Sequence, residues 1–221
     1  MMQQGGLKNI GNHMNKQTFE ILQRLKYILD NRPHIIDNVM NSYRENQYTS
    51  KQHLISTIES LGIFDEVDNV VVLACWYGAV LFPLLSKYCN SIIGYDMDAN
   101  CRYFNKVRPI SSNAAIKTSN IWLDRLPELK EADLIINTSC EHMPPMKYWD
   151  KWDQVMPGTF IAFQSNDMIG VKDHVNSVKS LTEFKNQMPD CIDIISMTEN
   201  DIMHKNSDKR SDKRFTIIGQ I

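Results

Sequence analysis

Apolar residues recur at helical spacing through the first part of the chain. From Lys16 they repeat at this spacing until Asn31-Arg32-Pro33 interrupts them, and a second run extends from Ile35 to Met40. A third run begins at Ser50, whose hydroxyl suits an N-cap, and ends at Gly62. The pattern therefore predicts three helices before the first strand.

The pattern then changes to short apolar runs that are typical of buried strands. Val70 to Leu73 forms one run, which breaks at Ala74-Cys75-Trp76-Tyr77-Gly78. After a helical segment, Ser91 to Tyr95 forms a second run that ends at Asp96. This order predicts a strand, a turn, a helix and a second, parallel strand. Ligands of parallel sheets bind at the carboxyl ends of the strands, where Asp96 can accept both hydroxyls of a ribose. The segment thus indicates a nucleoside-containing cofactor.

Strand and helix patterns continue to alternate along the rest of the chain. Helices are predicted at 100–107, 146–155 and 181–187, and a polar turn or short helix at 123–129. Strands are predicted at 114–119, 133–137 and 160–164, and a terminal antiparallel pair at 192–197 and 215–218. The segment 205–214 contains Ser-Asp-Lys-Arg twice, and its mixed charge predicts a solvated loop.

Composition restricts the class of protein. A chain of 221 residues with 43% hydrophobic residues fits one α/β domain with an accessory segment. The net charge of −2 favours a small or neutral substrate over nucleic acid. Five cysteines without a Cys-x-x-Cys pair predict reduced thiols and no metal site. We also expect a cytoplasmic protein without a membrane segment, because no apolar run approaches spanning length and the first residues lack signal-peptide features. The pattern leaves the oligomeric state undetermined.

Four motifs together resemble the class I S-adenosylmethionine-dependent methyltransferases. The turn 74–78 falls on their glycine-rich motif, and Asp96 falls on their ribose-binding acid. The segment 132–143 is similar to their fourth strand and the Glu-His turn after it, and 156–161 is similar to their Pro-Gly hairpin. Some phage-borne proteins assigned to the same superfamily are also similar.

This resemblance implies an α/β fold with a Rossmann-like seven-stranded mixed sheet, helices on both faces and an N-terminal helical cover. The implied organisation is a flexible N-terminus at 1–14, a helical cover at 15–62 and a methyltransferase domain at 63–221. The implied cofactor is S-adenosyl-L-methionine. The residues expected to bind it are Ala74, Cys75, Trp76, Gly78, Asp96, Met97 and Asn120.

The glycine-rich motif is degenerate in this chain. Ala74 and Trp76 stand where the family has glycine, and only Gly78 keeps it. Glycine allows a tight turn and close approach of the backbone to the ligand, so Trp76 conflicts with normal cofactor binding. Val72 replaces an acid that meets the methionine ammonium, whereas Asn120, at the position of an acid that reads adenine, can still accept from the adenine amine.

The predicted catalytic residues follow the fourth strand. His142 is the predicted general base, because an imidazole can accept a proton near neutral pH. Glu141 and His142 have an alternative role in bracing the next helix. Asn137 can orient a substrate amine by hydrogen bonding, without any base.

Two other functions stay open at this stage. A catalytically inactive or non-methylating Rossmann-like protein that binds or degrades S-adenosylmethionine is favoured by the lost glycines and by Val72. Asp96 and the Glu-His turn oppose that alternative. A nicotinamide-dependent enzyme shares the strand-helix-strand unit but needs a better preserved glycine-rich turn.

Overall fold

The computed structural model describes residues 16–107, 111–202 and 212–221. The chain divides into two compact units, one up to Asn41 and the other from Ser42 to Ile221. The predicted N-terminus at 1–14 lies outside the described residues. The third helix, α3 (Glu45–Ser60), which the predicted boundaries assign to the helical cover, belongs to the larger unit.

The smaller unit is helical, as its apolar spacing predicts. Helix α1 (Lys16–Asn31) ends before Pro33, whose ring cannot continue an α-helix. The 3-10 turn η1 (Pro33–Ile35) then leads into α2 (Ile36–Ser42). Whether these helices cover a site remains a prediction.

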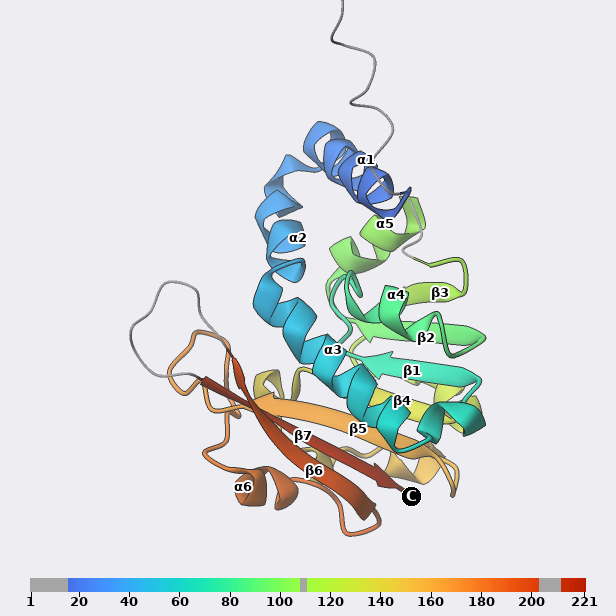
Figure 1. The fold of residues 1–221 in the computed structure, drawn as a ribbon, viewed down its shortest axis with the longest axis vertical. Coiled ribbons are helices and arrows are strands. Elements are labelled where there is room, and N and C mark those ends of the chain that lie inside the picture. The colour runs from blue at the N-terminus through green and yellow to red at the C-terminus, as the bar shows by residue number, and fades with distance from the viewer. Residues whose placement is uncertain (1–15, 108–110, 203–211) are drawn as a thin grey trace, which may run out of the picture. The chain divides into compact units, whose positions relative to one another are not determined.

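The larger unit contains a seven-stranded sheet in the order β3-β2-β1-β4-β5-β7-β6 (Figure 1). Its strands are β1 (Asn69–Leu73), β2 (Ser91–Asp96), β3 (Ala114–Thr118), β4 (Leu134–Asn137), β5 (Phe160–Asn166), β6 (Asp193–Ile202) and β7 (Asp212–Gln220). The first five strands pair in parallel, and β7 pairs antiparallel with both β5 and β6. The predicted seven-stranded mixed sheet is therefore confirmed.

Further helical segments connect these strands. They are η2 (Ile63–Glu66), α4 (Leu81–Leu85), α5 (Ala99–Val107), η3 (Pro127–Glu131), η4 (Cys140–His142) and α6 (Leu181–Lys185). Among the described residues, no helix has both the length and the apolar character needed to cross a membrane.

Both faces of the central strands β1, β4 and β5 are buried. Alternate residues such as Val71 and Ile135 belong to a core cluster with Leu129, Trp149 and Phe184. On the other face α4 packs tightly against β2, because a Cβ atom on Gly94 would lie 2.6 Å from both Phe82 Cζ and Cys75 Sγ. Continuous apolar strands of this kind are typical of parallel sheets with helices on both faces.

The N-cap predicted for the third helix is wrong. Helix α3 begins at Glu45 after the extended residue Arg44, so Ser50 lies inside the helix rather than at its N-cap. The buried Ser50 hydroxyl instead donates to Gln164 Oε1 at 3.2 Å. Gly62, with φ of 72°, follows the end of the helix as predicted.

The helix predicted at 146–155 is also wrong. This segment forms two separate 3-10 turns, η5 (Met146–Tyr148) and η6 (Trp152–Gln154). The Trp149 indole donates to the Ile121 carbonyl at 2.9 Å, and the Trp152 indole to the Met146 carbonyl at 2.7 Å. Tertiary hydrogen bonds and burial of the tryptophans override the helical spacing.

The charged segment 205–214 lies mostly outside the described residues. Its last residues, 212–214, belong to β7, and Arg214 is only 6% exposed. The prediction of a solvated loop is therefore wrong for these three positions. Pairing with β5 and β6 carries Arg214 into the interior of the sheet.

Candidate active site

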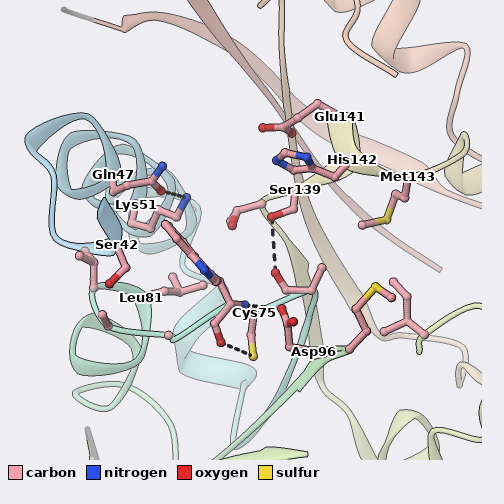
Figure 2. Close-up of a pocket in the computed structure, with 18 of the residues that line it drawn as sticks. Ser42, Gln47, Lys51, Cys75, Leu81, Asp96, Ser139, Glu141, His142 and Met143 are labelled. Atoms are coloured by element: carbon pink, nitrogen blue, oxygen red, sulfur yellow. Dashed lines mark hydrogen bonds between the residues drawn. The ribbon is translucent and has the colours of Figure 1, made fainter. Parts of the chain in front are cut away.

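A cavity of about 590 Å³ lies at the carboxyl ends of β1, β2 and β4. Figure 2 shows Gln47 and Lys51 of α3 on one side, Glu141 and His142 on the other, and Asp96 on a third. The complete lining is Ser42, Gln47, Lys51, Ala74, Cys75, Trp76, Gly78, Ala79, Val80, Leu81, Asp96, Met97, Ser119, Asn120, Ile121, Trp122, Thr138, Ser139, Glu141, His142, Met143, Pro144 and Arg214. Every residue predicted to bind the cofactor is among them.

The turn after β1 keeps a glycine-like backbone despite its sequence. Ala74, Trp76 and Gly78 have φ values of 47°, 50° and 61°, in the left-handed region. A residue with a Cβ atom pays about 1–2 kcal/mol for this conformation. Ala74 and Trp76 therefore adopt left-handed conformations despite their Cβ atoms, while the conflict of Trp76 with cofactor binding stays a prediction.

Backbone hydrogen bonds hold this strained turn. The Cys75 amide donates to the Tyr95 carbonyl at 2.9 Å, which joins the turn to the end of β2. The Trp76 amide donates to Asp96 Oδ2 at 2.7 Å, and the Gly78 amide to the Cys75 carbonyl at 3.0 Å. The surrounding fold therefore fixes a conformation that local preference disfavours.

Asp96 lies at the centre of this arrangement. Its second oxygen, Oδ1, accepts from the Asp98 amide at 2.9 Å. Partial burial raises the pKa of Asp96, while the hydrogen bonds from Asp98 and Trp76 oppose that rise. Each carboxylate oxygen has two lone pairs, so both can still accept from a diol.

The wall formed after β3 offers two further polar groups. Asn120 Oδ1 accepts from the Trp122 amide at 3.0 Å, and the Asn120 amide donates to Asp124 Oδ2 at 2.7 Å. Trp122 lines the cavity, and its buried indole nitrogen has no hydrogen-bond partner among the described residues. A buried donor of this kind can be satisfied by a ligand acceptor.

The opposite wall contains a buried ion pair. Arg214 Nη1 lies 2.9 Å from Glu141 Oε1, and both side chains are less than a tenth exposed. The same Glu141 oxygen accepts from Asn166 Nδ2 at 2.5 Å, and Arg214 Nη1 also donates to the Thr138 carbonyl at 3.5 Å. This pair ties β7 to the turn after β4.

His142 is exposed, and its ring is held from outside the turn. Its Nδ1 lies 3.0 Å from the Asp173 carbonyl, which leaves Nε2 available. The ring of His174 stands perpendicular to that of His142, with centroids 4.6 Å apart. Two imidazoles thus meet beside the Glu141 carboxylate.

Lys51 is the least expected charged group in the cavity wall. Its side chain is 9% exposed, and its ammonium donates to Gln47 Oε1 at 2.9 Å. Burial, helped by the positive charge of Arg214 and opposed by Glu141, lowers the pKa of Lys51 to about 7. Lys51 can therefore exchange a proton near neutral pH.

Asn137 does not line the cavity. It is fully buried, its Oδ1 accepts from the Ser139 amide at 2.9 Å, and its Nδ2 contacts Met143 Sδ at 3.2 Å. This geometry supports the turn that presents Glu141 and His142. It gives Asn137 no contact with a molecule in the cavity.

Solved structures with the same arrangement identify the fold. N-methyltransferase NodS from Bradyrhizobium japonicum, in complex with S-adenosyl-l-homocysteine, aligns over 91% of this chain and 98% of its own, with a TM-score of 0.61 and 14% identity. The chain has the S-adenosylmethionine-dependent methyltransferase fold. A methyltransferase of this type from Clostridium acetobutylicum aligns over 87% of this chain and 98% of its own, with a TM-score of 0.55 and 13% identity. No family profile and no curated protein sequence matches the chain.

Within this methyltransferase fold, three charged or polar residues near the site were not predicted from the sequence. Lys51 reads as a polar position of a helix, Arg214 as part of a charged loop, and His174 lies in an irregular segment. The polar residues on both sides of Lys51 gave no signal of its burial. The other two reach the site through contacts that sequence spacing does not encode.

Proposed function

We propose that the protein is an S-adenosylmethionine-dependent methyltransferase that acts on a small acceptor. The observation that carries this proposal is the turn after β1, where three residues adopt left-handed conformations and line the cavity, and where the Trp76 amide donates to Asp96. Strained backbone conformations cluster at functional sites, where the surrounding structure holds them in place. The methyltransferase fold of the sheet supports the same conclusion.

The residues of the cavity fit this cofactor. Asp96 offers two carboxylate oxygens to the ribose hydroxyls, and Asn120 and Trp122 lie on the wall where the predicted adenine contact falls. The orphaned Trp122 indole supplies a donor that a ligand can use. Val72 supplies no acid for the methionine ammonium, so we assign its recognition to the backbone carbonyls of the turn after β1, whose residues line the cavity.

Lys51 is the proposed proton acceptor. When bound, the cofactor supplies a methyl group, whose carbon bonds to the acceptor's lone pair as the bond to sulfur breaks and sulfur keeps the electron pair. Lys51 lines the cavity and is a neutral amine with a free lone pair above its lowered pKa of about 7, so it can take the acceptor's proton. The predicted base, His142, lies on the other side and is proposed to bind the acceptor, while Glu141 holds its turn in place.

The cavity favours a small acceptor. A volume of about 590 Å³ is in the range of small-molecule sites, and part of it must receive the cofactor. Lys51 and His142 in its wall favour an acceptor with a polar, ionisable group.

Incubation with methyl-labelled S-adenosylmethionine and a small-molecule extract tests this function. Label on a small acceptor is expected, and Lys51→Met should lose most of this transfer while Lys130→Met, at an exposed position, keeps it. Release of labelled thioether fragments, or intact cofactor despite measured binding, would contradict methyl transfer.

A further inference from the structure

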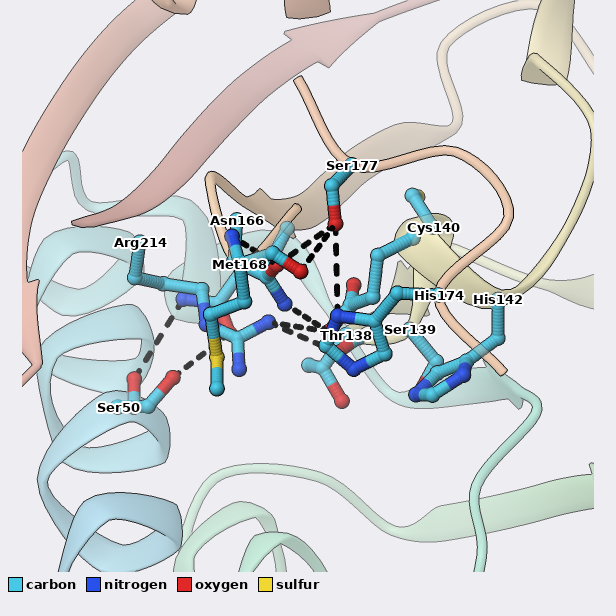
Figure 3. Close-up of polar contacts among 12 residues, drawn as sticks. Ser50, Thr138, Ser139, Cys140, His142, Asn166, Met168, His174, Ser177 and Arg214 are labelled. Atoms are coloured by element: carbon cyan, nitrogen blue, oxygen red, sulfur yellow. Dashed lines mark hydrogen bonds and ion pairs between the residues drawn. The ribbon is translucent and has the colours of Figure 1, made fainter. Parts of the chain in front are cut away.

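Three side chains with metal-binding atoms gather beside the cavity. The Glu141 carboxylate and the imidazoles of His142 and His174 place one ligand atom each within 4.8 Å of one another. Figure 3 shows His142 and His174 side by side, with His174 below Ser177 in this view. His174 comes from the segment between β5 and α6, so the fold brings it to the turn after β4.

The carboxylate at this cluster has an unsatisfied oxygen. Glu141 is 3% exposed, and its Oε1 already accepts from Arg214 and Asn166. Its Oε2 is buried without a hydrogen-bond partner among the described residues. A buried carboxylate oxygen without a partner is costly, and a cation at Oε2 would remove that cost.

The His142 ring is oriented as metal-binding histidines are. A carbonyl only accepts hydrogen bonds, so the 3.0 Å contact with the Asp173 carbonyl places the hydrogen on Nδ1 and the lone pair on Nε2. Asp173 adopts a φ of 68°, a strained conformation for a residue with a Cβ atom. The chain thus bears strain beside the carbonyl that fixes this tautomer.

Ser177 orients the second imidazole in the same way. Its hydroxyl lies 3.1 Å from Asn166 Oδ1 and 3.3 Å from the Met168 carbonyl, and both of these atoms are acceptors. The same oxygen lies 3.4 Å from His174 Nδ1, and in the tautomer with the hydrogen on Nδ1 it accepts from the imidazole while the hydroxyl donates to Asn166 or Met168. In that tautomer His174 Nε2 carries a lone pair, as a metal ligand must.

We infer that Glu141, His142 and His174 bind a divalent transition-metal ion, and that this ion holds an oxygen of the methyl acceptor. Imidazole ligands select zinc, iron and similar ions over magnesium and calcium, and two histidines with one carboxylate leave open coordination positions. Ligands about 2.1 Å from an ion lie at most about 4.2 Å apart, so small side-chain rotations would close the cluster. The acceptor role rests on the proposed methyl transfer.

Charge in the cluster indicates the class of acceptor. Arg214 shares the negative charge of Glu141, so the three ligands leave a divalent ion with excess positive charge. Glu141 and His142 also line the cavity, which puts the open positions beside the acceptor. An ion in this setting favours a carboxylate or an ionisable hydroxyl, because a metal lowers the pKa of a bound hydroxyl group.

Titration of the chelator-treated protein with Zn²⁺, and with Co²⁺ as a spectroscopic probe, tests the site. One equivalent of either ion should bind, and His174→Ala and Glu141→Gln should each weaken Zn²⁺ binding by at least about 100-fold. His53→Ala is the matched control, because His53 lies on α3 and contacts Thr198. Its Zn²⁺ affinity should equal that of the unmodified protein.

Unchanged Zn²⁺ affinity in the folded His174→Ala protein would overturn the site, and so would a thiolate absorption band with Co²⁺, which would assign the ion to cysteine. Acetate, as a probe for an anionic oxygen, should shift the Co²⁺ spectrum; an unchanged spectrum at saturating acetate would overturn the acceptor role. S-adenosylhomocysteine binding is measured separately and should survive His174→Ala. Its absence in the unmodified protein would contradict the proposed function and leave the metal result standing.

Discussion

Replacement of Lys51 by methionine should stabilise the protein in a pH-dependent way. Lys51 is 9% exposed, and burial and Arg214 lower its pKa from 10.5 to about 7. Between these two pH values the unfolded chain carries a proton on Lys51 that the folded protein lacks. The free energy of unfolding of the unmodified protein therefore gains a contribution that rises with pH in this window.

The size of the effect follows from the pKa difference. Each tenfold change in protonation corresponds to about 1.4 kcal/mol, so holding Lys51 charged in the folded protein below pH 7 costs up to about 5 kcal/mol. Methionine has a similar length and no charge to desolvate. Lys51→Met should thus gain most stability below pH 7, and the gain should shrink as the pH approaches 10.5.

Urea unfolding of both proteins at about pH 6 and about pH 9.5 measures this difference. Lys130→Met, at an exposed position of η3, is the control and should change stability little at either pH. An equal stability change for Lys51→Met at both pH values would refute the reasoning about Lys51. In the methyl-transfer assay, the unmodified protein should lose activity as the pH falls through about 7, because protonated Lys51 cannot accept a proton.

Two further substitutions test the site through stability. Ala74→Gly should raise the free energy of unfolding by about 0.5–1 kcal/mol, because glycine relieves the backbone strain at φ of 47° but costs chain entropy. The control Ala115→Gly, in β3, should lower the free energy of unfolding. A lower free energy of unfolding for Ala74→Gly would contradict the claim that Ala74 is strained. Glu141→Ala should cost about 3–5 kcal/mol by leaving Arg214 buried and unpaired, and addition of Arg214→Met should recover part of that loss. Chemical denaturation of the single and double variants measures this coupling, and strictly additive effects would argue against it.

The fold was largely predictable because its information is local. Strand runs such as Val70 to Leu73, helix ends at Pro33 and Gly62, and Asp96 after the second strand are all visible in short windows of sequence. The segment 146–155 was not, because burial of its tryptophans outweighs its helical spacing.

The site was less predictable because its contacts join distant segments. Arg214 meets Glu141 across 73 positions of the chain, and the strand that carries it begins in a run of charges. The left-handed turn at Trp76 is equally hidden, since sequence shows a tryptophan but not the hydrogen bond to Asp96 that fixes its backbone. Residue type alone therefore did not reveal the backbone conformation of this turn.

Calorimetric titration with S-adenosylhomocysteine tests the central claim most directly, because that claim is that the turn after β1 and Asp96 form a nucleoside site. The protein should bind one equivalent, and Asp96→Ala should weaken binding by about 1.5–3 kcal/mol through loss of hydrogen bonds to a charged carboxylate. NAD should not bind at the same site. Absence of binding by the folded protein, or equal affinity in a folded Asp96→Ala variant, would contradict the account.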